Sequence, residues 1–149
     1  MQKITPFLWL DGQVQEAVAH YSSVFPNTKV LSTSRGPGGS WMTATIDIEG
    51  QQLILFGGDA TYKLSPAASL YVHCETQAEV DRLWARLTDG GSESRCGWLV
   101  DRFGLSWQII PSILPELLQH PNREKAQRVV DAMMGMQKLD IAELERAAA

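Results

Sequence analysis

An internal repeat is the feature that most restricts how this chain can fold. Residues 6–10 form a short apolar strand pattern followed by a helical pattern over 13–25, and residues 69–73 precede a matching helical pattern over 76–87. In both helical patterns the apolar residues recur at three and four residue intervals, which predicts one buried face per helix. Thr76, with Glu79 three residues on, also predicts a capping box at the start of the second helix. One copy alone would leave a face of its sheet open. The repeat therefore predicts two similar modules in tandem.

Strand patterns follow each predicted helix. They cover residues 29–35, 41–48 and 52–56 in the first half, and 97–100 and 105–110 in the second. Alternation of apolar and polar residues is clearest over 42–48, and Glu49-Gly50 predicts a hairpin turn. The second half shows only a weak or missing counterpart of the strand at 29–35. Each half thus approximates β-α-β-β-β, which is an α+β fold with mixed sheets.

The chain turns helical beyond Pro111. We expect a short helical turn at 115–119, a longer helix capped by Asn122, and a last helix that begins at Asp140 with Glu143 as its capping-box partner. The apolar face of the longer helix comprises Ala126, Val129, Val130, Met133 and Met134. We interpret these methionines and Met136 as packing residues, with a dimer contact as the alternative. Residues 1–149 are predicted as a single domain, with module one at about 1–58, module two at about 67–111 and a helical segment at about 112–149.

Composition excludes several classes of protein. The 149 residues are 44% apolar and 20% charged, which suffices to bury a core. A net charge of −4 gives no general attraction to nucleic acid, and no apolar run approaches the roughly 20 residues of a membrane helix. The chain shows no signal segment, so we expect a cytoplasmic location. Two cysteines are too few for a disulfide framework or a cysteine-built zinc site.

Several motifs narrow the fold further. They are Phe7–Gly12, Phe25-Pro26-Asn27, Glu79–Asp81 with Trp84, and above all the stretch 96–111. The chain resembles the PhnB-like branch of the vicinal oxygen chelate superfamily, which includes glyoxalase I, extradiol dioxygenases and the bleomycin- and fosfomycin-resistance proteins. That branch often carries the label 3-demethylubiquinone-9 3-methyltransferase. The likeness extends over nearly the whole chain, including the C-terminal helices, and implies that each module curls into half of a barrel.

The resemblance also implies a metal position. In the superfamily, one residue from the first strand and one from the last strand of each module hold a divalent metal between the modules. The matching positions here are Pro6, Ile54, Ser69 and Gln108. Proline and isoleucine offer no side-chain donor and serine is a weak neutral ligand, whereas divalent sites usually take His, Asp or Glu. We therefore expect no bound divalent metal and no other cofactor.

The resemblance places a ligand cavity between the modules. The residues expected to line it are Pro6, Leu8, Ile54, Ser69, Tyr71, His73 and Gln108. Strand alternation points Ser69, Tyr71 and His73 in one direction. Histidine is a common general base, but no carboxylate nearby in sequence would orient His73, so a lining role is favoured.

Other candidate residues are interpreted as structural. Trp9 and Trp107 alternate away from the cavity and should pack under the helices. Cys74 should face the helix side and be inert, and Cys96 should be a packed small residue. Asp101 should shape the turn before the last strand.

Three functions are compatible with these observations. The favoured one is a metal-free protein that binds a small molecule, with or without catalysis. The second is a metal-dependent lyase, isomerase or dioxygenase, against which Pro6, Ile54 and Ser69 argue. The third is a methyltransferase, but the chain lacks the Gly-rich donor-binding loop of that class, since residues 36–39 read as a hairpin loop. The resemblance also implies a homodimer, and we expect no nucleic-acid or membrane partner.

Overall fold

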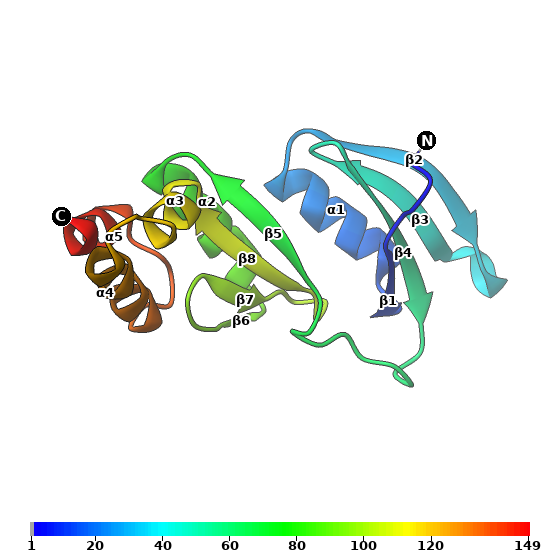
Figure 1. Cartoon of the computed structure of the whole chain (residues 1–149). Helices are drawn as coiled ribbons and strands as arrows, with labels where there is room; N and C mark the ends of the chain where they lie inside the picture. Colours follow the sequence, from blue (N-terminus) through cyan, green and yellow to red (C-terminus); the bar gives the residue numbers. More distant parts are fainter. Residues whose placement is uncertain (1) are drawn as a thin grey trace. The chain divides into compact units, whose positions relative to one another are not determined.

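Two compact units make up the chain in this computed structural model, which describes residues 2–149. Unit 1 spans Met1–Ser65 and unit 2 spans Pro66–Ala149. Each unit holds one four-stranded mixed sheet and a helix that packs on it (Figure 1). The predicted repeat of β-α-β-β-β modules is therefore confirmed, as is the α+β fold class.

Unit 1 is the more regular repeat. Its elements are β1 (Phe7–Asp11), α1 (Val14–Val24), β2 (Thr28–Arg35), a short 3-10 turn (Pro37–Gly39), β3 (Trp41–Ile48) and β4 (Gln51–Gly58). The sheet order is β1-β4-β3-β2, with β1 parallel to β4 and the other pairs antiparallel. Ala17 and Tyr21 of α1 are fully buried together with Ile46 and Leu55 of the sheet, so the apolar stripe of the helix closes one sheet face.

The predicted hairpin turn at Glu49-Gly50 is confirmed. Both residues have positive φ, 51° and 90°. Gly50 donates its backbone N–H to the Asp47 carboxylate at 2.8 Å, which fixes the turn from β3 into β4.

Unit 2 begins with the second copy of the module. Its elements are β5 (Ser69–Cys74), α2 (Gln77–Thr88), β6 (Ser92–Glu93), β7 (Trp98–Val100) and β8 (Ser106–Pro111), in the sheet order β5-β8-β7-β6. β6 is only two residues long, so the strand expected to be weak is present but short. The Thr76 hydroxyl accepts the Glu79 backbone N–H at 3.1 Å, as the capping box predicts.

The face of this sheet that α2 covers is buried. Trp107 is 2% exposed, and Cys74 is fully buried, as expected for residues that pack under the helix. Burial is the largest cause that raises the pKa of the Cys74 thiol to about 12, and the nearby Glu79 carboxylate adds to it. The predicted inertness of Cys74 follows, because the thiolate is the reactive form.

Asp101 organises the turn that leads into β8, as predicted. Its carboxyl group accepts the backbone N–H groups of Phe103 and Leu105 at 2.8 and 3.1 Å, and the Trp107 indole N–H at 2.8 Å. Asp101 is only 3% exposed. The indole bond was not foreseen, and it links the turn directly to the covered side of the sheet.

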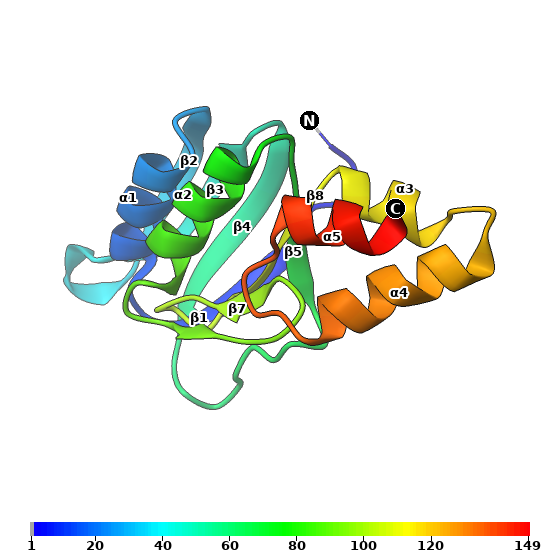
Figure 2. The ribbon, with the colours of Figure 1, turned by 90° about the vertical axis from the view of Figure 1, so that its left-hand side faces the viewer.

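Three helices complete unit 2: α3 (Ile113–Leu118), α4 (Arg123–Met134) and α5 (Ile141–Ala148). The Asn122 and Asp140 side chains cap α4 and α5, as predicted, and α3 begins two residues before the expected turn. α4 and α5 lie side by side (Figure 2), and Arg128 of α4 donates to the Ala147 carbonyl at 2.9 Å. No helix among residues 2–149 has the length and apolar character needed to cross a membrane.

The C-terminal helices enclose their own apolar cluster, made of Ile110, Leu114, Val129, Leu139 and Leu144. Met133 and Met136 pack against it, as expected. Met134 does not share this environment and is 55% exposed, which corrects its assignment to the apolar face. It is the last residue of α4, and its thioether sulfur lies 3.6 Å from the Cys96 sulfur.

Candidate functional site

The second sheet carries most of the predicted site residues on one face. The strand register pairs Tyr71 of β5 with Gln108 of β8, and Gln108 with Trp98 of β7. Ser69 and His73 share this face with Tyr71 because alternate strand residues point the same way. We call this surface, opposite α2, the polar face; it consists of Ser69, Tyr71, His73, Trp98 and Gln108.

Two contacts organise the polar face. The Gln108 side-chain amide donates to the Ser69 hydroxyl at 3.0 Å, so the hydroxyl keeps its own proton for donation and the Gln108 Oε1 remains as an acceptor. The rings of Tyr71 and His73 lie 4.8 Å apart between centroids. Burial raises the pKa of the Tyr71 phenol, so the group remains a neutral phenol that can donate a hydrogen bond. The face thus offers hydroxyl, amide, phenol and imidazole groups together.

The matching face of the first sheet is aromatic. Phe7 and Phe56 have ring centroids 5.5 Å apart, and Trp9 contacts Phe56 at 4.9 Å and Tyr62 at 5.0 Å. We call the surface made by Phe7, Trp9, Ile54 and Phe56, opposite α1, the aromatic face.

The position of Trp9 corrects the expectation that it packs under the helix. Trp9 pairs with Phe56 in the register, and its indole N–H donates to the Asp59 carbonyl at 2.8 Å. The indole lies over Gly58, where an added Cβ atom would come within 2.2 Å of the ring. Gly58 therefore allows the indole to lie flat on the strand end.

A register difference of one residue explains the error. Phe7 pairs with Ile54, just as Tyr71 pairs with Gln108. The residue equivalent to Ser69 is therefore Thr5, and Pro6 is displaced by one position. A slip of one residue exchanges the two faces of a strand.

The same slip affects the other predicted residues of the first strand. Leu8 pairs with the fully buried Leu55, which places it on the face that α1 covers, opposite to Ile54. Pro6 precedes β1, is exposed, and accepts the Ile54 backbone N–H at 2.9 Å through its carbonyl oxygen. Ile54 alone of the three predicted residues in unit 1 lies on the aromatic face.

Metal-ligating side chains are not clustered in the part of the chain that the structure describes. No group of three or more His, Cys, Asp or Glu side chains there is arranged to hold a metal ion. His73 has Tyr71 as its ring neighbour. Cys96 adopts a left-handed backbone, with φ of 58°, and contacts Met134, so it is held among sulfur and backbone groups of the C-terminal segment.

Comparison with known proteins identifies relatives of this fold. A family model described as 3-demethylubiquinone-9 3-methyltransferase matches residues 2–110. The chain is similar to a solved structure described as a putative 3-demethylubiquinone-9 3-methyltransferase, PhnB protein, from Bacillus cereus. The two are 33% identical with a TM-score of 0.66, over 72% of this chain and 97% of that one. No curated protein matches the chain.

Two more distant structures share the fold. A protein from Pseudomonas aeruginosa is 21% identical with a TM-score of 0.58, over 72% of this chain and 95% of that one. The fosfomycin resistance protein FosX from Listeria monocytogenes, solved with Mn(II) and a sulfate ion, is 16% identical with a TM-score of 0.55, over 72% and 90%. The family match ends at residue 110, so it does not extend over α3, α4 and α5 as the sequence resemblance suggested.

Proposed function

Because the chain belongs to the family described as 3-demethylubiquinone-9 3-methyltransferase, in the PhnB-like branch of the vicinal oxygen chelate superfamily, we propose that it binds a small organic molecule without a divalent metal. The polar face is the proposed binding surface. The observation that carries this proposal is the hydrogen bond between the Gln108 and Ser69 side chains. Both residues match metal-ligand positions of the superfamily, and both side chains are neutral.

The side chains at the superfamily's metal positions do not suit a divalent ion. After the register correction they are Thr5 and Ile54 in unit 1, and Ser69 and Gln108 in unit 2. These supply hydroxyl groups, one amide and one hydrocarbon side chain, with no carboxylate or imidazole. Hard and borderline divalent ions require several anionic or imidazole ligands to offset the loss of hydration. The Mn(II) of the FosX structure therefore has no matching ligand set here.

The chemistry of the polar face favours a ligand that is flat and carries oxygen or nitrogen. The Ser69 hydroxyl can donate and the Gln108 carbonyl oxygen can accept, while the Tyr71 phenol can do either. Tyr71 is 41% exposed and Trp98 is half-buried, so each ring presents part of its surface to a ligand. A neutral phenol or amide would satisfy these groups without burying a charge.

Methyl transfer, the activity in the family description, finds less support. A donor site of the usual kind uses a Gly-rich loop after the first strand of a doubly wound parallel sheet. Each sheet here has one parallel pair flanked by antiparallel strands, and residues 36–39 connect the antiparallel strands β2 and β3. Calorimetric titration with S-adenosylmethionine should give no saturable heat; tight binding would support methyl transfer instead.

Titration with phenol and with benzamide, both in the presence of EDTA, tests the proposal. We expect saturable binding by calorimetry that weakens about tenfold in Gln108→Leu, because one hydrogen-bonding group is lost while side-chain size is kept. Ile54→Val, a conservative change at the equivalent position of unit 1, is the control and should leave the affinity unchanged. The proposal would be refuted if binding required an added divalent metal, or if Gln108→Leu left the affinity unchanged.

We also propose that the protein forms a homodimer, as the superfamily resemblance implies. The exposed apolar side chains of unit 1, which include Ile4, Val30 and Leu31, supply surface for such a contact. Light scattering at micromolar concentration should give twice the chain mass of 16.5 kDa. A monomer mass under these conditions would remove the proposal.

A further inference from the structure

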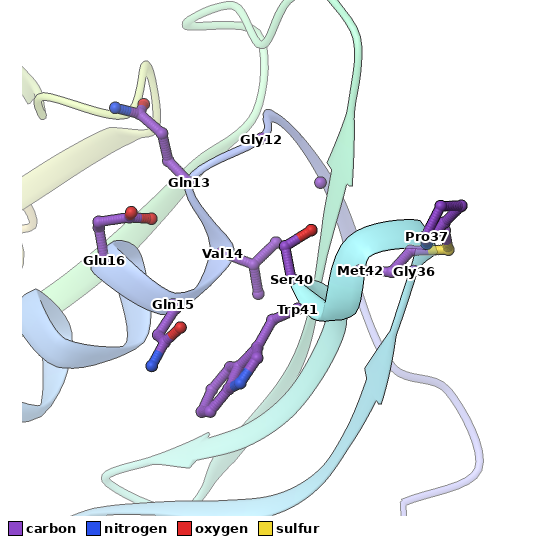
Figure 3. A pocket seen from close by; sticks show the side chains of 11 residues that line it. Gly12, Gln13, Val14, Gln15, Glu16, Gly36, Pro37, Ser40, Trp41 and Met42 are labelled. Carbon is purple, nitrogen blue, oxygen red and sulfur yellow. The ribbon is translucent and has the colours of Figure 1, made fainter.

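A cavity lies within unit 1, apart from the aromatic face. It occupies about 340 Å³ where the first turn of α1 meets the loop between β2 and β3 (Figure 3). None of its lining residues belongs to the aromatic face. Its volume lies in the range of small-molecule sites in proteins. Nothing in the proposed function makes use of it.

Two of the residues that line this cavity are glycines, Gly36 and Gly57. An added Cβ atom would lie 2.8 Å from the Met42 Cε atom at Gly36, and 3.0 Å from the Val14 Cγ2 atom at Gly57. A side chain at either position would therefore crowd a residue that itself lines the cavity, the flexible end of Met42 or the Val14 methyl group.

Hydrogen bonds hold the loop wall in place. The Gly36 backbone N–H donates to the Ser40 carbonyl at 2.9 Å, and the Arg35 guanidinium donates to the Gly39 carbonyl at 2.7 Å. The cavity wall is thus formed before any ligand arrives, which lowers the entropic cost of binding.

The walls combine one flat aromatic surface with neutral hydrogen-bonding groups. In Figure 3 the side chains of Val14 and Ser40 point toward one another from the helix and the loop, and the Trp41 indole extends from the adjoining strand. Trp41 is half-buried and Val14 is 2% exposed. Gln15 and Ser40 supply an amide and a hydroxyl. A flat ligand could stack on the indole while its edge bonds to these groups.

The charged groups at the cavity are of opposite sign. Glu16 is the one charged residue among those described as lining it, and its carboxylate repels anions. The N-cap residue Gln13 has a left-handed backbone and makes no side-chain cap, so the first-turn N–H groups of α1 give this end a partial positive charge. These two opposite charges partly offset each other, so an ionic ligand gains little there in return for the hydration it loses. A neutral ligand with both donors and acceptors loses less hydration on binding.

We propose that this cavity binds an uncharged, flat nitrogen heterocycle whose edge carries both N–H donors and carbonyl or ring-nitrogen acceptors. That is the chemistry of a free pyrimidine or purine base. The Trp41 indole stacks on the ring, the Gln15 side-chain carbonyl oxygen accepts from its N–H groups, and the Ser40 hydroxyl and the Gln15 amide donate to its acceptors.

Uracil and two charged relatives are the probes. Uracil, orotate and 5-(aminomethyl)uracil share one ring and differ by a carboxylate or an ammonium group. Titration of the full ¹⁵N-labelled chain should show saturable shifts of the backbone amides at residues 12–16 and 38–42 with uracil, and weaker binding of both charged relatives. Shifts confined to other parts of the chain, or binding of either charged relative as tight as that of uracil, would overturn the proposal.

Matched substitutions locate the site. Trp41→Ala should weaken uracil binding about tenfold through loss of stacking, whereas Tyr62→Ala, at an exposed aromatic residue of unit 1 that does not line the cavity, should leave it unchanged. Ser40 is exposed, so Ser40→Phe should fill the cavity and abolish binding without disturbing the core. The Ser40→Phe variant therefore still tests the proposal if Trp41→Ala fails to fold. Unchanged affinity in Ser40→Phe would contradict the assignment.

Discussion

The two sheets share one architecture but present different surfaces. Phe7 and Ile54 of the aromatic face occupy the same register positions as Tyr71 and Gln108 of the polar face. In both units the other sheet face is closed by a helix through aliphatic and aromatic contacts. The repeat therefore specifies the scaffold, while the side chains on the open faces have diverged. Function in such a molecule must be argued from those side chains rather than from the fold.

Thiol labelling tests how firmly α2 covers its sheet. The difference in labelling rate between Cys74 and Cys96 should be the largest effect. Cys74 has a pKa of about 12, so roughly one thiolate in ten thousand is present at pH 8. Cys96 is only partly buried and should react first. The labelling rate of Cys74 should rise about tenfold for each pH unit up to about 11, because the thiolate fraction rises in that proportion.

Mass spectrometry of the labelled peptides over a pH series measures these rates. Equal labelling of the two cysteines at pH 8 would show that the covered face opens readily.

The two turns that lead into the last strand of each module differ in how deeply their aspartate is buried. Asp101→Ala leaves two backbone N–H groups and the Trp107 indole N–H without their partner, and should cost about 3 kcal/mol of unfolding free energy. Asp47→Ala, at the equivalent turn of unit 1, removes one bond to Gly50 and should cost about 1 kcal/mol. Urea unfolding measures both.

Similar losses from the two substitutions would mean that burial of the Asp101 network contributes nothing beyond the turn itself. Asp101→Asn, which keeps acceptors for some of these bonds, should fall between the two.

The aromatic face depends on a glycine. Gly58→Ala places a methyl group against the Trp9 ring and should destabilise the protein by about 2 kcal/mol through overpacking. It should also shift the Trp9 fluorescence. Gly135→Ala is the matched control, because its nearest neighbour would be the Ala132 carbonyl oxygen at 3.6 Å. If Gly58→Ala left the stability of the protein unchanged, Trp9 would not lie over the strand end.

The two modules also differ at the start of their helices, because α2 has a side-chain cap and α1 has none. Substitutions at these two positions should give the smallest effects. Thr76→Ala removes the side-chain cap of α2 and should cost about 1 kcal/mol. Gln13 holds a left-handed backbone at the start of α1 with φ of 57°, so Gln13→Gly should stabilise by roughly 0.5 kcal/mol. Thermal unfolding of both variants checks the signs. Destabilisation by Gln13→Gly would mean that the Gln13 side chain contributes contacts of its own.

Local signals in the sequence predicted much of the fold. The caps at Thr76, Asn122 and Asp140 and the turn at Glu49-Gly50 were identified correctly because each depends on residues only a few positions apart. The face shared by Ser69, Tyr71 and His73 follows from alternation within one strand.

Features that depend on distant pairing could not be predicted. The register between β1 and β4 joins residues almost fifty positions apart, and a shift of one position exchanged the faces assigned to Leu8 and Trp9. The bond from the Trp107 indole to Asp101 depends on how β8 follows its turn. The exposure of Met134 depends on where α4 ends against Cys96.

Titration with Mn(II), followed by NMR, tests the central claim that the polar face works without a divalent metal. The paramagnetic ion broadens amide signals near its site. The account predicts no selective broadening at Ser69 and Gln108, and unchanged binding of phenol and benzamide when EDTA is replaced by Mn(II). Selective broadening at those two residues, together with ligand binding only in the presence of Mn(II), would contradict it.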